Sequence, residues 1–360
     1  MTTQHEGAPP TVTAETAAMA RALELAATPG VPLGPNPRVG CVLLAPDGQV
    51  VAEGYHRGAG TPHAEVDALS RAGDRARGAT AVVTLEPCNH TGRTGPCAEA
   101  LIDAGVARVV IAMPDPNPVA AGGAQRLHEA GVEVEVGVLE GPAQALNRAW
   151  LFGLTHGRPL VTWKLAITLD GRSAAADGTS RWVSSKAARI DTHQLRSVCD
   201  VMLVGTGTVA IDDPALTVRD ADDQPLAHQP LRVVMGEREL PPERRIFDGS
   251  LAPGEAPSLH LRTRDPEKAL AELFELGRRH VFTEGGPTLA AAFLRAGLVD
   301  EVVAYIAPKL LGAGLNAIGD LGITTITDAL QLEIVQASVV GEGPDTNVRL
   351  VLEPARREGN

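Results

Sequence analysis

The chain has 360 residues, 44% of them hydrophobic, and a net charge of −12. A chain of this length exceeds the size at which one hydrophobic core usually divides, so we expect two domains. The acidic balance repels a phosphate backbone and excludes long nucleic acid as a partner, whereas a small phosphorylated substrate needs only one or two local arginines. No apolar run approaches about 18 residues, which excludes a membrane-spanning helix and a membrane partner.

The four cysteines are too few for the disulfide framework of a small secreted protein. Residues 1–11 are polar, lack the pattern of a secretory signal and are expected to form a frayed tail. We therefore expect a reducing, cytoplasmic location, where Cys88 and Cys97, close in sequence, indicate a metal or catalytic site. Cys41 and Cys199 lie in apolar runs, which is typical of buried core cysteines.

Residues 39–155 alternate between short β-branched runs and alanine-rich helical patterns, as in a layered α/β domain. Gly73, Gly105 and Gly131 follow the helical stretches and predict their ends. The expected strands are Val39–Leu44, Ala81–Leu85, Val109–Ala112 and Val132–Val138. The expected helices are Ala64–Ala72, Ala98–Ala104 and Gly123–Ala130.

A second alternation follows a break at Gly157-Arg158-Pro159, so we place the domain boundary at residue 157, with domains at residues 1–157 and 158–360. The expected strands are Leu160–Ile167, Val201–Val204, Leu231–Val234, His280–Thr283 and Glu301–Ile306. The expected helices are Ser185–Leu195, Pro266–Leu276 and Thr288–Ala296. Two final apolar runs, Leu332–Val340 and Asn347–Leu352, predict an antiparallel hairpin, and residues 220–230 predict a surface loop.

Three soft metal ligands occur in the first half. His63 precedes a helical stretch, Cys88 follows a strand, and Cys97 lies nine residues beyond Cys88. One imidazole and two thiolates leave the fourth position of a tetrahedral Zn²⁺ open, as in catalytic rather than structural sites. Glu65 is not needed as a ligand and is placed to move a proton, which is the H-x-E and P-C pattern of the zinc deaminases.

Each part of this pattern also has an ordinary interpretation. A histidine before a helix is usually solvated, and a lone Pro-Cys pair means little, so only their joint occurrence favours a metal site. The spacing departs from the C-x-x-C of nucleobase deaminases, because Asn89–Pro96 separate the two cysteines. This longer loop carries His90 and Arg93, and a cation in it suits a substrate phosphate.

The second half contains two glycine-rich turns, each directly after an expected strand. Gly205–Ala210 fits the G-x-G-x-x-A pattern of a phosphate turn, and Glu284–Thr288 precedes a helix. Such turns are common without a ligand, and the first lies inside the domain rather than on its first strand, unlike a standard Rossmann unit. Two of them in one domain nevertheless favour a dinucleotide.

With these residues in view, the sequence resembles the bifunctional riboflavin-biosynthesis deaminase/reductase family of bacteria. In the first half the resemblance rests on Pro35–Gly40, His63–Glu65, Thr84–Cys97 and Asp115–Pro118. It implies a cytidine-deaminase-like three-layer α/β domain in which Zn²⁺ is bound by His63, Cys88 and Cys97 and Glu65 is catalytic. It also implies that the pyrimidine ribose phosphate contacts Asn36, His56, His90 and Arg93.

In the second half the resemblance rests on Trp163–Ala166, Thr168–Arg172, Ser180–Ser185, Asp212–Arg219, Glu284–Leu289 and Ala307–Gly312. It implies a dihydrofolate-reductase-like domain that binds NADPH. The implied coenzyme contacts are Ala166, Trp182, Thr208, Asp212, Gly286, Pro287, Thr288, Leu289, Ala290, Ala291 and Ala292. The implied substrate contacts are Ser180, Arg196, Leu216, Arg219 and Glu284.

Single residues of this second set have ordinary interpretations as turn, solvated or core positions, so only their combination carries the resemblance. Lys164 and Asp170 fall near the transferred hydride, with their roles open. Where the family tends to carry Asp-Ser after the strand Leu231–Val234, this chain has Gly236-Glu237, and a glutamate does not favour an added 2′-phosphate.

The resemblance implies two successive reactions in what we expect to be a homo-oligomer. The first is zinc-dependent hydrolytic deamination of 2,5-diamino-6-ribosylamino-4(3H)-pyrimidinone 5′-phosphate, and the second is NADPH-dependent reduction to 5-amino-6-ribitylaminouracil 5′-phosphate. One alternative is a nucleoside or tRNA deaminase fused to a folate-type reductase, which the long loop between the cysteines and the acidic charge disfavour. The other is a non-catalytic zinc module in which Glu65 only orients His63.

Overall fold

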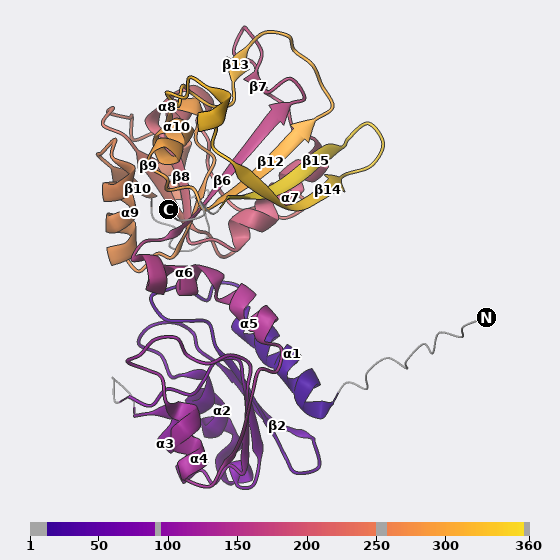
Figure 1. Cartoon of the computed structure of the whole chain (residues 1–360), viewed down its shortest axis with the longest axis vertical. Coiled ribbons are helices and arrows are strands. Elements are labelled where there is room, and N and C mark those ends of the chain that lie inside the picture. Colours follow the sequence, from indigo (N-terminus) through magenta and orange to yellow (C-terminus); the bar gives the residue numbers. More distant parts are fainter. Residues whose placement is uncertain (1–12, 91–94, 250–257, 356–360) are drawn as a thin grey trace, which may run out of the picture. The chain divides into compact units, whose positions relative to one another are not determined.

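Two compact units make up the chain in the computed structural model, which describes residues 13–90, 95–249 and 258–355 (Figure 1). The first unit runs up to Leu154 and the second begins at Thr155, so the division falls inside helix α6 (Arg148–His156). Each unit has its own sheet and its own buried apolar clusters.

The first unit is built on a five-stranded sheet of order β2-β1-β3-β4-β5. Strand β1 pairs antiparallel with both β2 and β3, and β3, β4 and β5 are parallel. The strands are β1 (Gly40–Leu44), β2 (Val50–Tyr55), β3 (Thr80–Val83), β4 (Arg108–Ile111) and β5 (Glu133–Val136). The other helices of this unit are α1 (Ala14–Ala26), α2 (Ala64–Ala72), α3 (Cys97–Asp103), α4 (Gly123–Glu129) and α5 (Glu140–Leu146), with a 3₁₀ turn at Gly73–Ala76.

Helices cover both faces of this sheet, because alternate strand residues are apolar on opposite sides. Leu43, Val83 and Ile111 face α2, α3 and α4 in one cluster. Val42 and Val110 face α1, α5 and α6 in the other. The three-layer α/β arrangement expected for the first half is therefore confirmed.

Glycine permits the closest of these helix–strand contacts. A Cβ added at Gly40 would lie 1.9 Å from the carbonyl oxygen of Ala22 on α1, and one at Gly54 would lie 2.4 Å from the carbonyl oxygen of Ala64 on α2. Both distances are far below van der Waals contact, so only a residue without a side chain lets these helices approach β1 and β2.

The second unit is built on an eight-stranded sheet of order β10-β9-β8-β11-β6-β12-β15-β14, in which the strands from β10 to β12 are parallel and β15 runs antiparallel to both β12 and β14. The strands are β6 (Leu160–Thr168), β8 (Val201–Gly205), β9 (Leu231–Met235), β10 (Ser258–Leu261), β11 (His280–Thr283), β12 (Glu301–Ala307), β14 (Leu332–Val340) and β15 (Asn347–Pro354). A separate two-stranded sheet joins β7 (Arg172–Ala174) to β13 (Leu315–Asn316).

Helices again cover the larger sheet. Helices α9 (Pro266–Glu275) and α10 (Pro287–Arg295) pack on one face through Leu270, Leu273 and Phe293. The other face is covered by α7 (Lys186–Ser197), by α8 (Thr206–Asp212) and by a loop segment that includes the 3₁₀ turn Arg245–Phe247. The α/β class and the order of the two domains agree with the sequence analysis.

Most expected elements are present with ends shifted by one or two residues, including the C-terminal hairpin of β14 and β15. Residues 220–230 form a loop with a single bridge between Arg219 and Pro225. Helices α1, α5, α6 and α8 and strands β2, β7, β10 and β13 were not predicted. In some of these the apolar pattern is weak: β2 and β10, for example, lie at sheet edges and are only partly buried.

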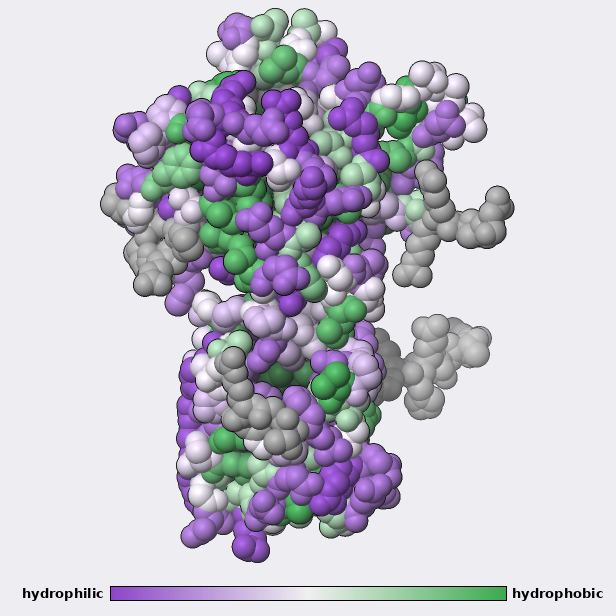
Figure 2. Space-filling view, turned by 90° about the vertical axis from the view of Figure 1, so that its left-hand side faces the viewer, coloured by the Kyte–Doolittle hydropathy of each residue, from purple (hydrophilic) through white to green (hydrophobic). Residues whose placement is uncertain are grey.

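The surface mixes polar and apolar residues. Figure 2 shows one face, on which hydrophobic residues form small groups separated by hydrophilic ones. Within the residues that the structure describes, none of the helices has the length and apolar character needed to cross a membrane. All four cysteines are free and buried.

Candidate functional site

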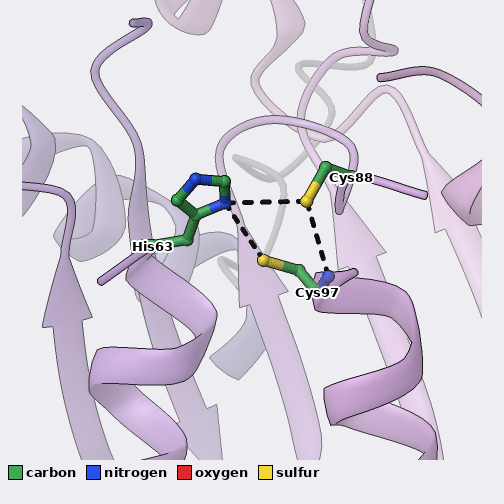
Figure 3. Close-up of side chains that lie close together, drawn as sticks. All are labelled: His63, Cys88 and Cys97. Carbon is green, nitrogen blue, oxygen red and sulfur yellow. Dashed lines mark hydrogen bonds between the residues drawn. The ribbon is translucent and has the colours of Figure 1, made fainter. Parts of the chain in front are cut away.

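His63, Cys88 and Cys97 converge from three different segments of the first unit (Figure 3). His63 occupies the extended position just before α2, Cys97 is the first residue of α3, and Cys88 lies on the loop that follows β3. The ends of β3 and the starts of α2 and α3 meet at one edge of the sheet, which is why residues far apart in sequence share this place.

The geometry of the three side chains suits a metal ion. Their ligand atoms all lie within 4.8 Å of one another. The Nδ1 atom of His63 is 3.2 Å from the Sγ atom of Cys97 and 3.6 Å from that of Cys88. One nitrogen and two sulfur donors form a set that Zn²⁺ prefers, and three protein ligands leave a position for water or substrate.

The two sulfur atoms differ in protonation. A hydrogen bond with Cys97 is the main reason why the pKa of Cys88 falls to about 4, and His63 contributes to the same shift. The pKa of Cys97 rises well above its usual range, because its thiol donates to Cys88 and is buried. Cys88 is therefore the more easily ionised of the two thiols, and a metal ion binds the thiolate form.

Glu65 lies in the first turn of α2 and is only 3% exposed. Burial raises the pKa of its carboxyl group to about 7, and the neighbouring Cys88 adds to that rise. Glu65 also interacts with the side chain of Cys97, so it borders the three ligands without belonging to them. This placement suits an acid or base that serves a group at the metal.

Asn36 and His56 lie together beside the metal ligands. His56 is 3% exposed, and its ring stands edge-on to that of His63 with centroids 5.2 Å apart. Its Nδ1 atom is 3.0 Å from the carbonyl oxygen of Pro62, so Nδ1–H donates and Nε2 accepts from the Asn36 amide 3.0 Å away. Burial lowers the pKa of His56, which keeps the ring neutral.

The remaining two residues expected near the first site have different outcomes. His90 follows Asn89 on the loop after Cys88, and its buried Nδ1 atom has no hydrogen-bond partner among the described residues. Arg93 lies outside the described residues.

Two supporting residues were missed in the sequence. The carboxylate of Glu86 accepts from the backbone of Asp115, Gly122 and Ala124 at 2.9 to 3.1 Å, which ties the start of α4 to the strand end before Cys88. Asn147, 3% exposed, exchanges two hydrogen bonds with the backbone of Arg38. Glu86 directly precedes the Pro-Cys pair, a signal that was available, whereas nothing in the sequence links Asn147 to Arg38.

The second unit contains a cavity of about 750 Å³. The two glycine-rich turns lie next to each other in it, because β8 and β11 are parallel neighbours and Gly205 and Glu284–Gly286 follow their carboxyl ends. After β8 the chain adds β9 and β10 on one side of β8, and then returns to add β11 on the opposite side, between β8 and β6. Ligands of open α/β sheets bind at such a reversal of strand order.

Most residues expected in the second site line this cavity. They are Ala166, Ser180, Trp182, Arg196, Thr208, Asp212, Leu216, Arg219, Glu284, Gly286, Pro287, Thr288 and Leu289. Ala290, Ala291 and Ala292, all on α10, are not among the lining residues, and Ala290 packs in the core. Arg181, Arg189 and Arg245 also line the cavity and were not singled out in the sequence.

A partly buried charge cluster forms one wall of the cavity. The Glu284 carboxylate lies 2.5 Å from Nε of Arg196 and 3.5 Å from Nζ of Lys164. Burial alone would raise the pKa of Glu284, but Arg196 and Lys164 outweigh it and lower that pKa to about 2. Burial lowers the pKa of Lys164. Lys164, whose role was open, lines the cavity and pairs with Glu284 there.

Other expected residues are held by local contacts. The Arg219 guanidinium donates to Thr217 and to the carbonyl oxygen of Asp223. Arg189 stacks on the ring of Trp182, 4.3 Å from its centroid. Asp170 lies outside the cavity lining and accepts from the backbone of Leu311 and Gly312, so it fixes that turn.

Comparisons with known proteins assign both halves. Residues 5–113 match the model of the cytidine and deoxycytidylate deaminase zinc-binding region, and residues 159–344 match that of the RibD C-terminal domain. The chain is 51% identical over 318 residues to the riboflavin biosynthesis protein RibD of Mycobacterium tuberculosis, covering 88% of this chain and 91% of that one.

Solved structures agree. RibD of Acinetobacter baumannii superposes with a TM-score of 0.81 at 38% identity, covering 96% of this chain and 100% of that chain. A diaminohydroxyphosphoribosylaminopyrimidine deaminase/5-amino-6-(5-phosphoribosylamino)uracil reductase of Thermotoga maritima superposes with a TM-score of 0.79 at 32% identity, covering 95% and 99%. With its zinc site at His63, Cys88 and Cys97 and its second cavity in a RibD C-terminal domain, the chain belongs to the RibD family of bifunctional riboflavin-biosynthesis deaminase/reductases.

Proposed function

We propose that the domain at residues 1–157 removes the 2-amino group of 2,5-diamino-6-ribosylamino-4(3H)-pyrimidinone 5′-phosphate by hydrolysis. The domain at residues 158–360 then reduces the ribosyl group with NADPH to give 5-amino-6-ribitylaminouracil 5′-phosphate. The printed activity of the Thermotoga maritima protein supports this substrate class. The observation that carries the proposal is the convergence of His63, Cys88 and Cys97 beside a buried Glu65.

In the first domain the protein's own groups position substrate and proton. Zinc, when bound, supplies a coordinated water whose pKa lies near neutrality. Glu65 takes the proton of the attacking water and passes it to the departing amine, because its carboxyl group borders the ligand Cys97. Asn36 and His56, joined by a hydrogen bond, contact the pyrimidine ribose phosphate together with His90 and Arg93.

In the second domain the coenzyme lies over the two glycine-rich turns. The cavity volume and the adjacent strand ends support a dinucleotide there. The proposed coenzyme contacts are Ala166, Trp182, Thr208, Asp212 and Gly286–Leu289. The proposal also includes the next three residues of α10, which are Ala290, Ala291 and Ala292. The substrate contacts are Ser180, Arg196, Leu216, Arg219 and Glu284. Two arginines suit the phosphate of this substrate.

A Glu65→Gln variant tests the deaminase. We expect it to retain zinc and to lose ammonia release by at least about 100-fold, because general acid–base catalysis contributes that much. Zinc content is measured by elemental analysis and ammonia by a coupled assay. The matched control is Glu24→Gln. Glu24 is an exposed residue of α1 that forms an ion pair with Arg21, and this variant should release ammonia at the wild-type rate. Wild-type ammonia release by Glu65→Gln would leave Glu65 as a residue that only orients His63.

We also propose that the chain forms a homo-oligomer through β14. This strand ends the eight-stranded sheet and pairs only with β15 in the described part of the chain, yet Ile334 and Val339 are 65% and 69% exposed. An apolar edge strand is a template for pairing with another strand, and the same strand of a second copy provides one of matching length.

Sedimentation equilibrium tests this interface. Wild-type protein should sediment as a dimer or larger assembly, and the double variant Ile334→Lys and Val339→Lys should sediment as a monomer. Ile326→Lys, a change at an even more exposed apolar residue outside the sheet edge, should leave the assembly intact. A monomeric wild-type chain contradicts the proposal.

The free state of all four buried cysteines supports a reducing, cytoplasmic location.

A further inference from the structure

Three neighbouring strands of the second unit end side by side next to the cavity. Gly205 of β8, which lines the cavity, is in register with Met235 of β9, and Met235 is in register with Leu261 of β10. The strands are parallel, so their carboxyl ends lie at the same edge of the sheet. Residues just beyond Met235 therefore lie next to the glycine-rich turn after β8, and residues just beyond Leu261 lie one strand farther from it.

The loop after β9 lies against the start of α8. Gly236 has φ +136, and a Cβ added to it would lie 2.9 Å from Oγ1 of Thr206, the first residue of that helix. The backbone of Gly236 donates to the carbonyl oxygen of Leu261 at 3.0 Å and accepts from Nε2 of His260 at 2.8 Å. These contacts fix where the next residue, Glu237, leaves the sheet.

Glu237 and Arg264 form an ion pair across this edge. Oε2 of Glu237 lies 3.1 Å from Nε of Arg264, and the two side chains are 60% and 79% exposed. Exposed pairs of this kind contribute little to the stability of a fold, so a ligand that binds either member can separate them easily.

The chemistry of this pair matches the part of a nicotinamide coenzyme that distinguishes NADH from NADPH. In dinucleotide sites, an acidic residue at the end of the strand next to the glycine-rich turn accepts from the ribose 2′-hydroxyl, whereas a nearby arginine binds a 2′-phosphate. Here β9 is the strand next to that turn, Glu237 follows it, and Arg264 follows the strand after it.

We propose that Glu237 and Arg264 set the coenzyme preference of the second domain, an inference that rests on the proposed use of a nicotinamide dinucleotide there. With NADPH, the Arg264 guanidinium leaves Glu237 and pairs with the 2′-phosphate, while the Glu237 carboxylate repels that phosphate. With NADH, Glu237 accepts from the 2′-hydroxyl and keeps Arg264. The pair therefore narrows the difference in affinity between the two coenzymes.

Isothermal titration calorimetry of the full chain with NADPH and with NADH, at one fixed salt concentration, tests the proposal without any turnover. Glu237→Gln should tighten NADPH binding relative to NADH by roughly tenfold, because one close like charge is removed. Arg264→Gln should weaken NADPH binding by about tenfold or more and change NADH binding by less than about threefold, because it removes a charge-assisted contact to the phosphate.

The ion pair of Glu239 with Arg262 provides matched controls on the same two loops. Glu239→Gln and Arg262→Gln make the same changes in charge and should leave the NADPH to NADH affinity ratio within about twofold of the wild-type ratio. If the control variants change the NADPH to NADH affinity ratio as much, the effect comes from the overall electrostatic field of the two loops. That result would overturn the specific roles of Glu237 and Arg264. Binding of both coenzymes with a ratio unchanged in Glu237→Gln and Arg264→Gln would overturn the inference alone. Failure of the wild-type chain to bind either coenzyme would overturn the proposed reductase function and this inference together.

Discussion

At the scale of single residues, Glu284 couples the reductase cavity to pH. Its carboxylate is buried between Arg196 and Lys164, and these cations lower its pKa from an ordinary value of 4.5 to about 2. A carboxyl group with a depressed folded-state pKa stabilises the fold above its unfolded pKa, and this contribution is lost as the pH falls toward the folded pKa. The relevant window therefore lies between about pH 5 and pH 2.

This coupling gives a measurable stability difference. The free energy of unfolding of wild type should fall by about 2 kcal/mol more than that of Glu284→Gln between pH 5 and pH 3. Urea unfolding at a series of pH values measures it. Glu272→Gln, an exposed change on α9, should follow the wild-type curve. If the free energy of unfolding depends on pH in the same way for wild type and Glu284→Gln, Arg196 and Lys164 do not stabilise the ionised form of the Glu284 carboxyl group.

Residues with a chemical pattern in the sequence were predictable, and residues that act through the backbone were not. His63, Cys88 and Cys97 were identified because soft ligands with this spacing are rare without a metal. Arg232, 1% exposed, donates to the carbonyl oxygens of Ala215, Arg245 and Asp248. Every residue has a carbonyl group, so such contacts leave no trace in sequence.

At the scale of elements, α4 supports the metal loop through a very close approach. A Cβ added at Gly123, the first residue of α4, would lie 1.7 Å from the carbonyl oxygen of Pro87, the residue before Cys88. The Glu86 carboxylate holds the same two segments together. A substitution at the start of α4 should therefore shift the zinc ligand Cys88.

The prediction is that Gly123→Ala lowers the free energy of unfolding by roughly 1–3 kcal/mol and weakens zinc binding, because the added methyl group displaces the Pro87 backbone. Calorimetric melting and a zinc competition titration measure the two effects. Gly141→Ala on α5, where an added Cβ meets nothing within 4 Å, should be neutral or stabilising by up to about 1 kcal/mol. Unchanged zinc affinity in Gly123→Ala would contradict the proposed support.

Elements with a clear apolar period were predictable, and those without one were missed. The parallel strands β8, β9 and β11 are short runs of mainly apolar residues, because both of their faces are covered. Strand β2 is half-buried, and helix α1 combines small residues with a narrow apolar face, so neither has a strong period. Their positions depend instead on the tertiary contacts of Gly54 and Gly40.

At the scale of the whole molecule, the two chemistries use separate sheets, so zinc removal should affect only one of them. A chelator should abolish ammonia release and leave the NADPH dissociation constant within about twofold, since no zinc ligand belongs to the second unit. Adding Zn²⁺ back should restore ammonia release. A large loss of NADPH affinity after chelation would show that the second fold depends on the metal.

Because each sheet is covered by helices of its own unit, the buried residues beneath the two reactions pack in separate clusters. Substitutions that improve packing around β1 and β3 can accumulate without disturbing the strands that carry the hydride-transfer cavity. The thermal stability of each domain can accordingly be engineered separately. A substitution that gives resistance to an inhibitor of one reaction need not change the rate of the other reaction.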